Sequence, residues 1–342
     1  MRDNLFVKTF KGKDILITGG CGSIGSEIVK QLIQFQPRRI RVFDNNESGL
    51  FELQQKLQSP LIRTLVGDIR DKERLRFAVR GVDIVFHAAA LKHVPLCEYN
   101  PFEAVKTNVI GTQNLIETCR ENLVEKFIAI STDKAVNPIN TMGATKLLSE
   151  KLVMTANIGI NCKTKFSCVR FGNVLNSIGS VIPIFKQQIK RGGPVTITDE
   201  NMVRFFMSMS EAVNLVLEAA TLSKGGDIFI LKMKRLKITD LADVVIKRMA
   251  HKYGHDPRSI KIKITGIRPG EKLEEQLITE EEFSQLINVK KMWIIRPLRI
   301  LPHTHQYYKK VPLKLGSKEI NEEVILDKKE LETLLEKYDP QI

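Results

Sequence analysis

Three consecutive residues, Thr132, Asp133 and Lys134, place a hydroxyl, a carboxyl and an amine side by side in the sequence. A neighbouring acid and base can protonate one atom of a ligand while removing a proton from the next. Lys134 must be neutral to act as a base, and we expect burial and the charge of Lys146 to lower its pKa. Asp133 needs the opposite shift in order to hold its proton.

The apolar, β-rich run 127–130 comes directly before these residues and predicts a buried strand. In a doubly wound α/β sheet, the carboxyl ends of the strands face the crevice where ligands bind. The polar segment 131–138 is therefore expected to line a ligand site. The spacing alone also fits a turn whose charges form only an ion-pair network.

A glycine-rich loop follows the first predicted strand, 14–18, and precedes an amphipathic stretch, 23–35, that predicts a helix. Glycine is needed there because the backbone turns tightly and must approach a pyrophosphate without Cβ atoms in the way. The helix N-terminus then faces the phosphates. This strand–loop–helix context predicts a dinucleotide site. Its expected contacts are Gly19, Gly22, Ser23, Ile24 and Gly25.

The ends of the next strands supply further expected contacts with the cofactor. Asp44 follows the strand 40–43, about 20 residues past the glycines, where a carboxylate binds ribose hydroxyls and repels a 2′-phosphate. No arginine follows in residues 45–47, so we favour NAD over NADP as the cofactor. Asp44 and Asp68 also fit the role of helix caps. The other expected contacts, beyond strands 61–66 and 82–87, are Asn45, Asp68, Ile69, Ala88, Ala89 and Ala90.

Length and composition limit the class of protein. The 342 residues, 43% of them hydrophobic, suffice for one large or two intimately joined domains. No membrane-spanning run or signal peptide is present, and the five cysteines are scattered, so we expect a cytoplasmic protein. The net charge is +14, but Lys and Arg are spread along the chain. We interpret them as a solvated basic surface and expect no nucleic acid partner.

The order of predicted elements indicates the fold class. Strands and helices alternate through the first half, which favours an α/β fold with a Rossmann-type doubly wound parallel sheet in residues 1–172. Within it, residues 1–11 form an arm with no assigned role. From residue 173 on the pattern is less regular, and 281–342 is charged and irregular. The pair His303 and His305 is too weak a pattern for a metal site, so no metal is expected.

Several motifs together resemble extended short-chain dehydrogenases/reductases: the loop 18–25, the segment 87–90, Asn108 and Lys146. Within that group, residues 131–140 (STDKAVNPIN) are similar to the signature of UDP-N-acetylglucosamine 4,6-dehydratases of the polysaccharide-biosynthesis family. The segments 91–95, 170–174, 204–207 and 268–272 resemble this family too. The resemblance covers about residues 12–285. It implies a smaller α/β C-terminal domain in 173–342, mainly for substrate, with some segments returning to the first domain.

The resemblance also implies a three-step reaction on a UDP-sugar, for surface polysaccharide or glycan synthesis. Hydride leaves C4 for the nicotinamide, water is lost across C5 and C6, and hydride returns to C6. Oxidation at C4 is needed because a ketone there makes the C5 proton acidic. In this scheme Lys134 is the C5 base, Asp133 is the C6 acid and Thr132 binds the C4 hydroxyl. Lys146 binds the nicotinamide ribose, and Asn108 is a further cofactor contact.

The same resemblance assigns residues to the substrate. Arginine suits a diphosphate because its planar donors match phosphate oxygens. One departure concerns position 142: relatives often carry Tyr-x-x-x-Lys, whereas this chain has Met142 before Lys146. Methionine has no exchangeable proton, so the tyrosine's share of catalysis must pass to another group or to water. The expected substrate contacts are Lys92, Asn173, Val181, Thr196, Arg204 and Arg268.

Alternative functions stay open at this stage. An inverting dehydratase would return the C5 proton to the other face, and a nucleotide-sugar 4-epimerase would need no Asp-Lys pair. A non-catalytic NAD(P)-binding regulator would fit Met142, although Asp133, Lys134 and Lys146 argue against it. Family analogy further suggests a homo-oligomer with the helices 101–120 and 141–156 at an interface.

Overall fold

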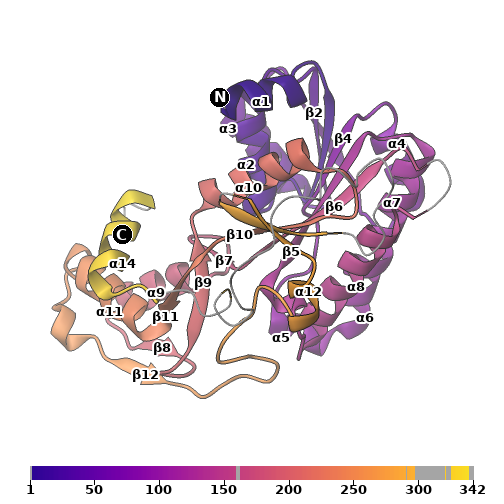
Figure 1. Cartoon of the computed structure of the whole chain (residues 1–342). Helices are drawn as coiled ribbons and strands as arrows, with labels where there is room; N and C mark the ends of the chain where they lie inside the picture. The colour runs from indigo at the N-terminus through magenta and orange to yellow at the C-terminus, as the bar shows by residue number, and fades with distance from the viewer. Residues whose placement is uncertain (1, 159–161, 290, 297–319, 321–324, 339–342) are drawn as a thin grey trace.

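The computed structural model describes residues 2–158, 162–289, 291–296, 320 and 325–338. A large sheet with helices on both faces makes up one lobe, and a smaller lobe with short strands lies beside it (Figure 1). The nine strands of the large sheet follow the order β13-β14-β10-β6-β5-β4-β1-β2-β3. The seven strands from β10 to β3 are parallel, and the hairpin β13–β14 adds antiparallel at one edge. The predicted Rossmann-type α/β fold is confirmed.

The strands of this sheet lie close to the apolar runs that predict them. Helices cover both faces, so the central strands can be apolar along their whole length; β1, for example, is buried at every residue. The bounds are β1 (Asp14–Thr18), β2 (Arg39–Asp44), β3 (Ile62–Val66), β4 (Ile84–His87), β5 (Lys126–Thr132), β6 (Lys165–Phe171), β10 (Ile228–Leu231), β13 (Leu286–Val289) and β14 (Met292–Ile295).

Two groups of helices cover the sheet (Figure 1). On one face α10 packs against both α1 and α2, and on the other α7 packs between α4 and α8. Side chains cap several of these helices, as Asn46, Asp71 and Asn140 each accept a hydrogen bond from an amide of the first turn. The bounds are α1 (Arg2–Phe10), α2 (Ser23–Ile33), α3 (Glu47–Leu57), α4 (Lys72–Val79), α5 (Val94–Tyr99), α7 (Gly111–Glu121), α8 (Thr141–Thr155), α10 (Met209–Leu222) and α12 (Glu280–Phe283).

The helix predicted over 101–120 has a wider turn in its middle. It consists of α6 (Pro101–Ala104), the π-helical segment η1 (Val105–Ile110) and α7. The carbonyl of Asn108 in this segment accepts hydrogen bonds from the hydroxyls of Thr112 and Ser149. The π segment therefore joins this helix to α8.

The smaller lobe has its own apolar core. Short sheets of the order β11-β9-β7 and β12-β8 pack there with three helices. The bounds are β7 (Asn173–Val174), β8 (Val195–Ile197), β9 (Val203–Met207), β11 (Lys234–Lys237), β12 (Ile262–Ile264), α9 (Val181–Lys190), α11 (Ile238–Met249), α14 (Lys328–Tyr338) and the 3₁₀ turns η3 (His251–Tyr253) and η4 (Pro257–Ser259).

The prediction of an irregular segment from residue 281 onward was wrong in part. Two short apolar runs in it form β13 and β14, which complete the large sheet, and Trp293 is buried there. Their antiparallel pairing places apolar side chains against the core that α10 and β10 already form. His303 and His305 lie outside the described residues. Within those residues, no group of three or more His, Cys, Asp or Glu side chains is arranged to hold a metal ion.

None of the helices described here combines the length and the apolarity needed to cross a membrane.

The N-terminal arm is a helix that belongs to the main core. Phe10 of α1 is fully buried and lies 6.1 Å from the ring of Phe35 and 6.2 Å from that of Phe86, centre to centre. Phe6 packs edge-on against Phe35 at 5.2 Å. Rings at these separations attract one another beyond the gain from burial alone. The arm therefore covers part of the sheet.

Phe10→Ala is expected to lower the free energy of unfolding by about 3–5 kcal/mol, because the lost ring leaves a cavity. Denaturant titration followed by circular dichroism measures this change. Phe51→Ala is the matched control, since Phe51 is 61% exposed, and a change of about 0.5 kcal/mol is expected there. Equal effects of the two substitutions would show that α1 does not belong to the core.

Candidate functional site

Thr132, Asp133 and Lys134 lie together at the carboxyl end of β5, where the strand passes into the 3₁₀ turn η2 (Asp133–Ala135). The Thr132 hydroxyl donates to Asp133 Oδ1 at 2.9 Å and accepts from the Lys134 amide at 3.4 Å. Lys134 Nζ donates to the same Oδ1 at 3.0 Å. One carboxylate oxygen thus receives both the hydroxyl and the ammonium.

The second oxygen of Asp133 is buried and accepts no hydrogen bond from the described residues. Gly172 lies close to this oxygen, since a Cβ added to the glycine would be 3.1 Å from Oδ2. A buried carboxylate oxygen without a partner is unfavourable. The described residues therefore leave one acceptor position of Asp133 unfilled.

Lys134 also reaches the smaller lobe. Its Nζ lies 3.4 Å from Asn173 Oδ1 and 3.5 Å from Glu275 Oε1. Glu275 is buried, and no motif in the sequence marks it: it follows the segment 268–272 by three residues in a run of charged side chains. The sequence reasoning missed this residue. Asn173, an expected substrate contact, does lie beside Lys134.

The pKa of Lys134 differs from the expectation. Burial favours the neutral amine, but the carboxylates of Asp133 and Glu275 outweigh it and raise the pKa above its ordinary value. Burial, together with the nearby charge of Asp133, raises the pKa of Glu275 although Lys134 opposes that shift. The expected lowering at Lys134 was wrong because the sequence did not reveal the second carboxylate.

Lys146 and Met142 lie one turn apart on α8. Lys146 donates to the carbonyl of Ile130 on β5, and burial lowers the pKa of its amine. Met142 is buried in a small apolar cluster with Val94, Cys97 and Ala104. Its side chain therefore packs α8 against α5 and α6.

The glycine loop has the geometry of a pyrophosphate cradle. Gly19 has a φ of +68°, and a Cβ on it would lie 2.5 Å from the amide nitrogen of Ala89. A Cβ on Gly25 would lie 2.2 Å from the carbonyl of Gly19. No side chain caps the N-terminus of α2, which begins at Ser23. These features fit the phosphates of a dinucleotide, because free amides and close backbone approach are what such a ligand needs.

Asp44 lies next to this cradle. Its Oδ2 accepts from the Cys21 amide at 2.9 Å, and its Oδ1 accepts from the Asn46 amide at 3.0 Å. Burial and the neighbouring Asp44 raise the pKa of the Cys21 thiol to about 12, so this thiol stays protonated. Asp44 thus joins the end of β2 to the glycine loop, where a bound ribose would lie.

Other expected cofactor residues have partners within the chain. Asp68 forms an ion pair with Arg70 at 2.6 Å, and hydrogen bonds from Arg70 lower the pKa of its carboxyl. Asn108 is buried and bonds both backbone groups of Leu91, at 2.8 and 3.0 Å, and the hydroxyl of Thr145. It therefore fixes the loop that follows Ala88–Ala90. Ile69 is buried against the backbone of Gly111 in α7.

His87 ends β4 between two hydroxyls. Its Nδ1 lies 2.7 Å from Thr18 Oγ1, and its Nε2 lies 3.0 Å from Thr112 Oγ1. Burial and the charge of Lys146 lower the pKa of the imidazole to about 3, so it stays neutral at ordinary pH. The geometry agrees with a packed strand-end residue.

The backbone of one residue, Ile178, joins the glycine loop to Lys92, an expected substrate residue. The amide of Ile178 donates to Ser23 Oγ at 3.0 Å, and its carbonyl accepts from Lys92 Nζ at 2.7 Å. Ile178 lies between β7 and α9, in a turn with positive φ at Asn176 and Gly179. This segment spans from the start of α2 to the loop after β4.

The remaining expected substrate residues lie in the smaller lobe. The Arg204 guanidinium is buried and donates to the carbonyls of Val203, Lys272 and Leu273. Arg268 lies exposed in a turn whose Gly270 carbonyl accepts from Asn140.

Two further expected substrate residues pack α9 against β8. Thr196 exchanges two hydrogen bonds with Gln188, and Val181 packs against the core of the smaller lobe.

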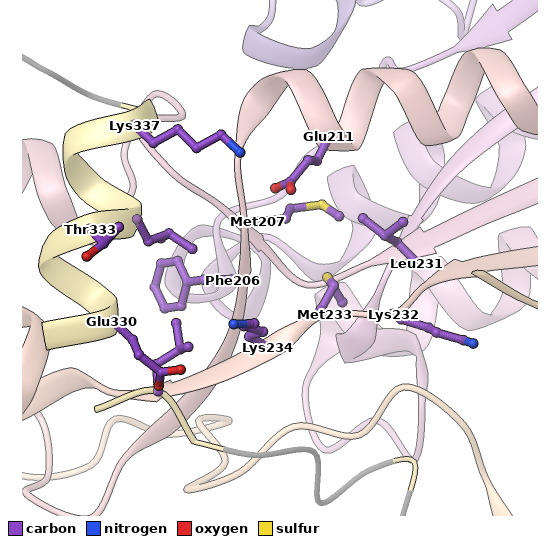
Figure 2. Close-up of a pocket in the computed structure, with 12 residues that line it drawn as sticks. Phe206, Met207, Glu211, Leu231, Lys232, Met233, Lys234, Glu330, Thr333 and Lys337 are labelled. Atoms are coloured by element: carbon purple, nitrogen blue, oxygen red, sulfur yellow. The ribbon is translucent and has the colours of Figure 1, made fainter. Parts of the chain in front are cut away.

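A separate cavity of about 450 Å³ lies between α14, the end of β9 and the turn from β10 to β11 (Figure 2). Phe206, Met207 and Met233 supply much of its apolar wall, and Glu211, Glu330 and Lys337 lie around it. None of the expected site residues is among the twelve that line it. It is distinct from the Asp133–Lys134 site.

Comparison with known proteins identifies the family of this chain. The model of the family described as "Polysaccharide biosynthesis protein" matches residues 15–297. The chain belongs to this family.

Several known proteins are similar to the chain over most of their length. A Methanocaldococcus jannaschii protein, named only as an uncharacterized membrane protein, is 62% identical over 84% of this chain and 87% of its own length. A Campylobacter jejuni protein named UDP-N-acetylglucosamine 4,6-dehydratase (inverting) is 45% identical over 84% of each. One from Rickettsia bellii, named UDP-glucose 4-epimerase, is 41% identical over 81% of this chain and 80% of its own. The names of these relatives thus include a 4,6-dehydratase and a 4-epimerase.

A solved structure supports the fold of this family member. The X-ray structure of Pen from Bacillus thuringiensis is 41% identical, covers 96% of this chain and 98% of its own, and superposes with a TM-score of 0.89.

Gly19→Ala is expected to abolish binding of NADH, because the added methyl would meet the Ala89 backbone. Binding is followed by the fluorescence of NADH. Gly81→Ala is the matched control: Gly81 also has a positive φ, +67°, but no atom lies within 4 Å of its added Cβ. Both variants carry the same backbone strain, so loss of binding in both would contradict a steric role for Gly19.

Proposed function

We propose that this chain is a UDP-N-acetylglucosamine 4,6-dehydratase that acts in polysaccharide synthesis. The observation that carries the proposal is the acid/base pair of buried Asp133 and half-buried Lys134, beside Thr132 at the ligand end of a Rossmann-type sheet. A bound nicotinamide dinucleotide would supply the hydride acceptor and donor that a redox-neutral dehydration requires. The carboxylate of Asp44 beside the glycine loop supports NAD over NADP. Lys146, which donates to the Ile130 carbonyl of β5, is expected to bind the nicotinamide ribose.

Thr132 replaces the usual tyrosine in this proposal. As the C4 hydroxyl becomes a ketone, its proton passes to the Thr132 oxygen while Thr132 gives its own proton to Asp133 Oδ1, 2.9 Å away. Asp133 thereby gains the proton that it later delivers to the departing C6 hydroxyl. Met142 takes no part in proton transfer, which agrees with its apolar surroundings.

Lys134 is the base that removes the C5 proton once C4 is oxidised. Its amine lies beside Asp133, as a base and an acid must when they act on neighbouring carbons, C5 of the sugar ring and the exocyclic C6. The C5 proton moves to Nζ, the C6 hydroxyl leaves as water with the Asp133 proton, and Lys134 returns a proton to C5 after hydride reaches C6. Atoms and protons balance over the cycle. Return of the proton by the same amine keeps the configuration at C5. Inversion, which the name of the Campylobacter jejuni relative includes, is the alternative course and needs a proton from the opposite face.

The substrate is expected to lie between the lobes. Asn173 contacts Lys134 and is expected to bind the sugar. Lys92 and the exposed Arg268 are expected to offer positive charge to the diphosphate. Val181 and Thr196 are further candidates for substrate contacts in the smaller lobe. Arg204 holds three carbonyls, so its contribution includes fixing the segment 272–273.

A 4-epimerase is the second candidate, because the Rickettsia bellii relative carries that name. Epimerisation at C4 needs oxidation and reduction at one carbon and no acid/base pair for C5 and C6. The Asp133–Lys134 pair therefore favours the dehydratase.

Incubation of the purified chain with UDP-N-acetylglucosamine and NAD tests the proposal. Mass spectrometry is expected to show a product lighter by one water, and NMR of the sugar ring reports the C5 configuration. An isomer of unchanged mass would indicate the epimerase. No conversion with NADH still bound would indicate a non-catalytic binding protein.

Lys134→Ala and Asp133→Asn are each expected to slow dehydration by about 10²–10⁴-fold, since each removes one partner of the acid/base step. Lys134→Ala should also abolish exchange of the C5 proton with deuterium from solvent. Lys56→Ala, an exposed lysine of α3, is the control and should retain full activity. Normal deuterium exchange in Lys134→Ala would refute the assignment of the base.

Self-association is a further part of the proposal. Leu96, Tyr99 and Phe102 on α5 and α6 are 63%, 88% and 65% exposed, which supports an interface between copies of the chain. Light scattering of the purified protein measures the mass of the assembly.

A further inference from the structure

Lys134 lies between two buried carboxylates, of which the mechanism above uses only one. Asp133 is bonded to Nζ at 3.0 Å, and Glu275 lies on the other side, with Oε1 3.5 Å from Nζ. Glu275 belongs to the smaller lobe and is 5% exposed. Its second oxygen, Oε2, is buried and accepts no hydrogen bond from the described part of the chain, and Lys272 Nζ lies 3.7 Å from it, beyond hydrogen-bond distance.

A buried carboxylate oxygen that accepts no hydrogen bond is unfavourable if the group is charged and much less so if the group carries a proton. Four charged groups face Glu275. Asp133 disfavours its charged form, whereas Lys134, Arg204 and Lys272 favour that form. Burial exceeds each of these influences, and the pKa of the carboxyl is raised. The location therefore suits a carboxyl that alternates between charged and neutral forms.

The state of Lys134 makes such a group necessary for the proposed chemistry. Two carboxylates raise the pKa of Lys134, so its resting form is the ammonium. An ammonium cannot remove the C5 proton. Asp133 cannot accept the extra proton of Lys134, because Asp133 receives a proton from Thr132 and must deliver it to the C6 hydroxyl.

We propose that Glu275 is the positioning residue that takes the proton of Lys134 and thereby frees the amine to act as the base. In this step an N–H bond of Lys134 breaks and an O–H bond forms on Glu275 Oε1, so an ion pair becomes two neutral groups. The proton returns to Lys134 at the end of the cycle, and no oxidant or other reactant is needed. This inference rests on the proposed dehydratase function.

The location of the proton predicts a distinct pH profile. In the wild type, the resting and active forms differ only in where one proton lies, so kcat is expected to stay flat around neutral pH. In Glu275→Gln the amine must lose its proton to solvent. The kcat of this variant should therefore fall by about 10²-fold at neutral pH and rise about tenfold per pH unit until Lys134 titrates.

Two further variants complete the experiment. Glu275→Asp keeps a carboxyl and should restore a flat profile with part of the lost rate. Glu274→Gln is the matched control, because the neighbouring side chain is 58% exposed and pairs with Arg235 instead; it should behave as the wild type. If Glu275 has only a structural role, Glu275→Gln would lower kcat but leave kcat independent of pH, which would contradict the proposal. A wild-type kcat with a flat pH profile in Glu275→Gln would also overturn it.

A measurement without turnover separates this inference from the proposed function. Infrared difference spectra of the NAD-free protein over a pH titration should contain a protonated carboxyl band that Glu275→Gln lacks and Glu274→Gln retains. Absence of that band would overturn the role of Glu275 even if dehydration occurs. Its presence in a protein that does not dehydrate UDP-N-acetylglucosamine would refute only the assigned reaction. Circular dichroism confirms that each variant is folded.

Discussion

The ammonium of Lys134 lies where the two lobes meet, with 20% of its side chain exposed, and much of the nearby structure depends on the need to surround that charge. Moving an ion out of water is unfavourable by several kcal/mol unless partners replace the lost hydration. The first lobe supplies Asp133 and the second supplies Glu275 and Asn173. Lys272 donates to the carbonyl of Val136, just beyond η2, at 2.7 Å. The charge thus holds the segment 272–275 against the end of β5.

A second buried cation joins the elements behind the site. The Arg170 guanidinium on β6 pairs with Glu150 of α8 at 2.6 Å and with Glu282 of α12 at 2.8 Å, and it also donates to the carbonyl of Leu277. Its two carboxylates outweigh burial and raise its pKa, so it stays charged. Glu150 lies one turn after Lys146 on α8. Arg170 therefore sets the position of the helix that carries Lys146 and, through residue 277, the segment that carries Glu275.

The elements of the first lobe were predictable because each of their signals is local. Apolar runs mark β1, β4 and β5, and the glycine loop marks the start of α2. Thr132, Asp133 and Lys134 are adjacent in sequence, so their meeting in space needed no knowledge of the fold. Glu275 gave no such signal, since it reaches Lys134 only through the packing of a segment about 140 residues away in the chain. The direction of the Lys134 pKa shift was missed for the same reason. The π-helical segment within 101–121 was also unpredictable, because its pattern of apolar residues fits a regular helix.

The backbone of Ile178 joins the start of α2 to the loop after β4. Its amide donates to the Ser23 hydroxyl, and its carbonyl accepts from the Lys92 ammonium. A hydroxyl that accepts a hydrogen bond still has its own proton to donate, and an ammonium has three N–H groups, of which this bond uses one. Both side chains can therefore donate to a further acceptor while the segment stays bonded at both ends.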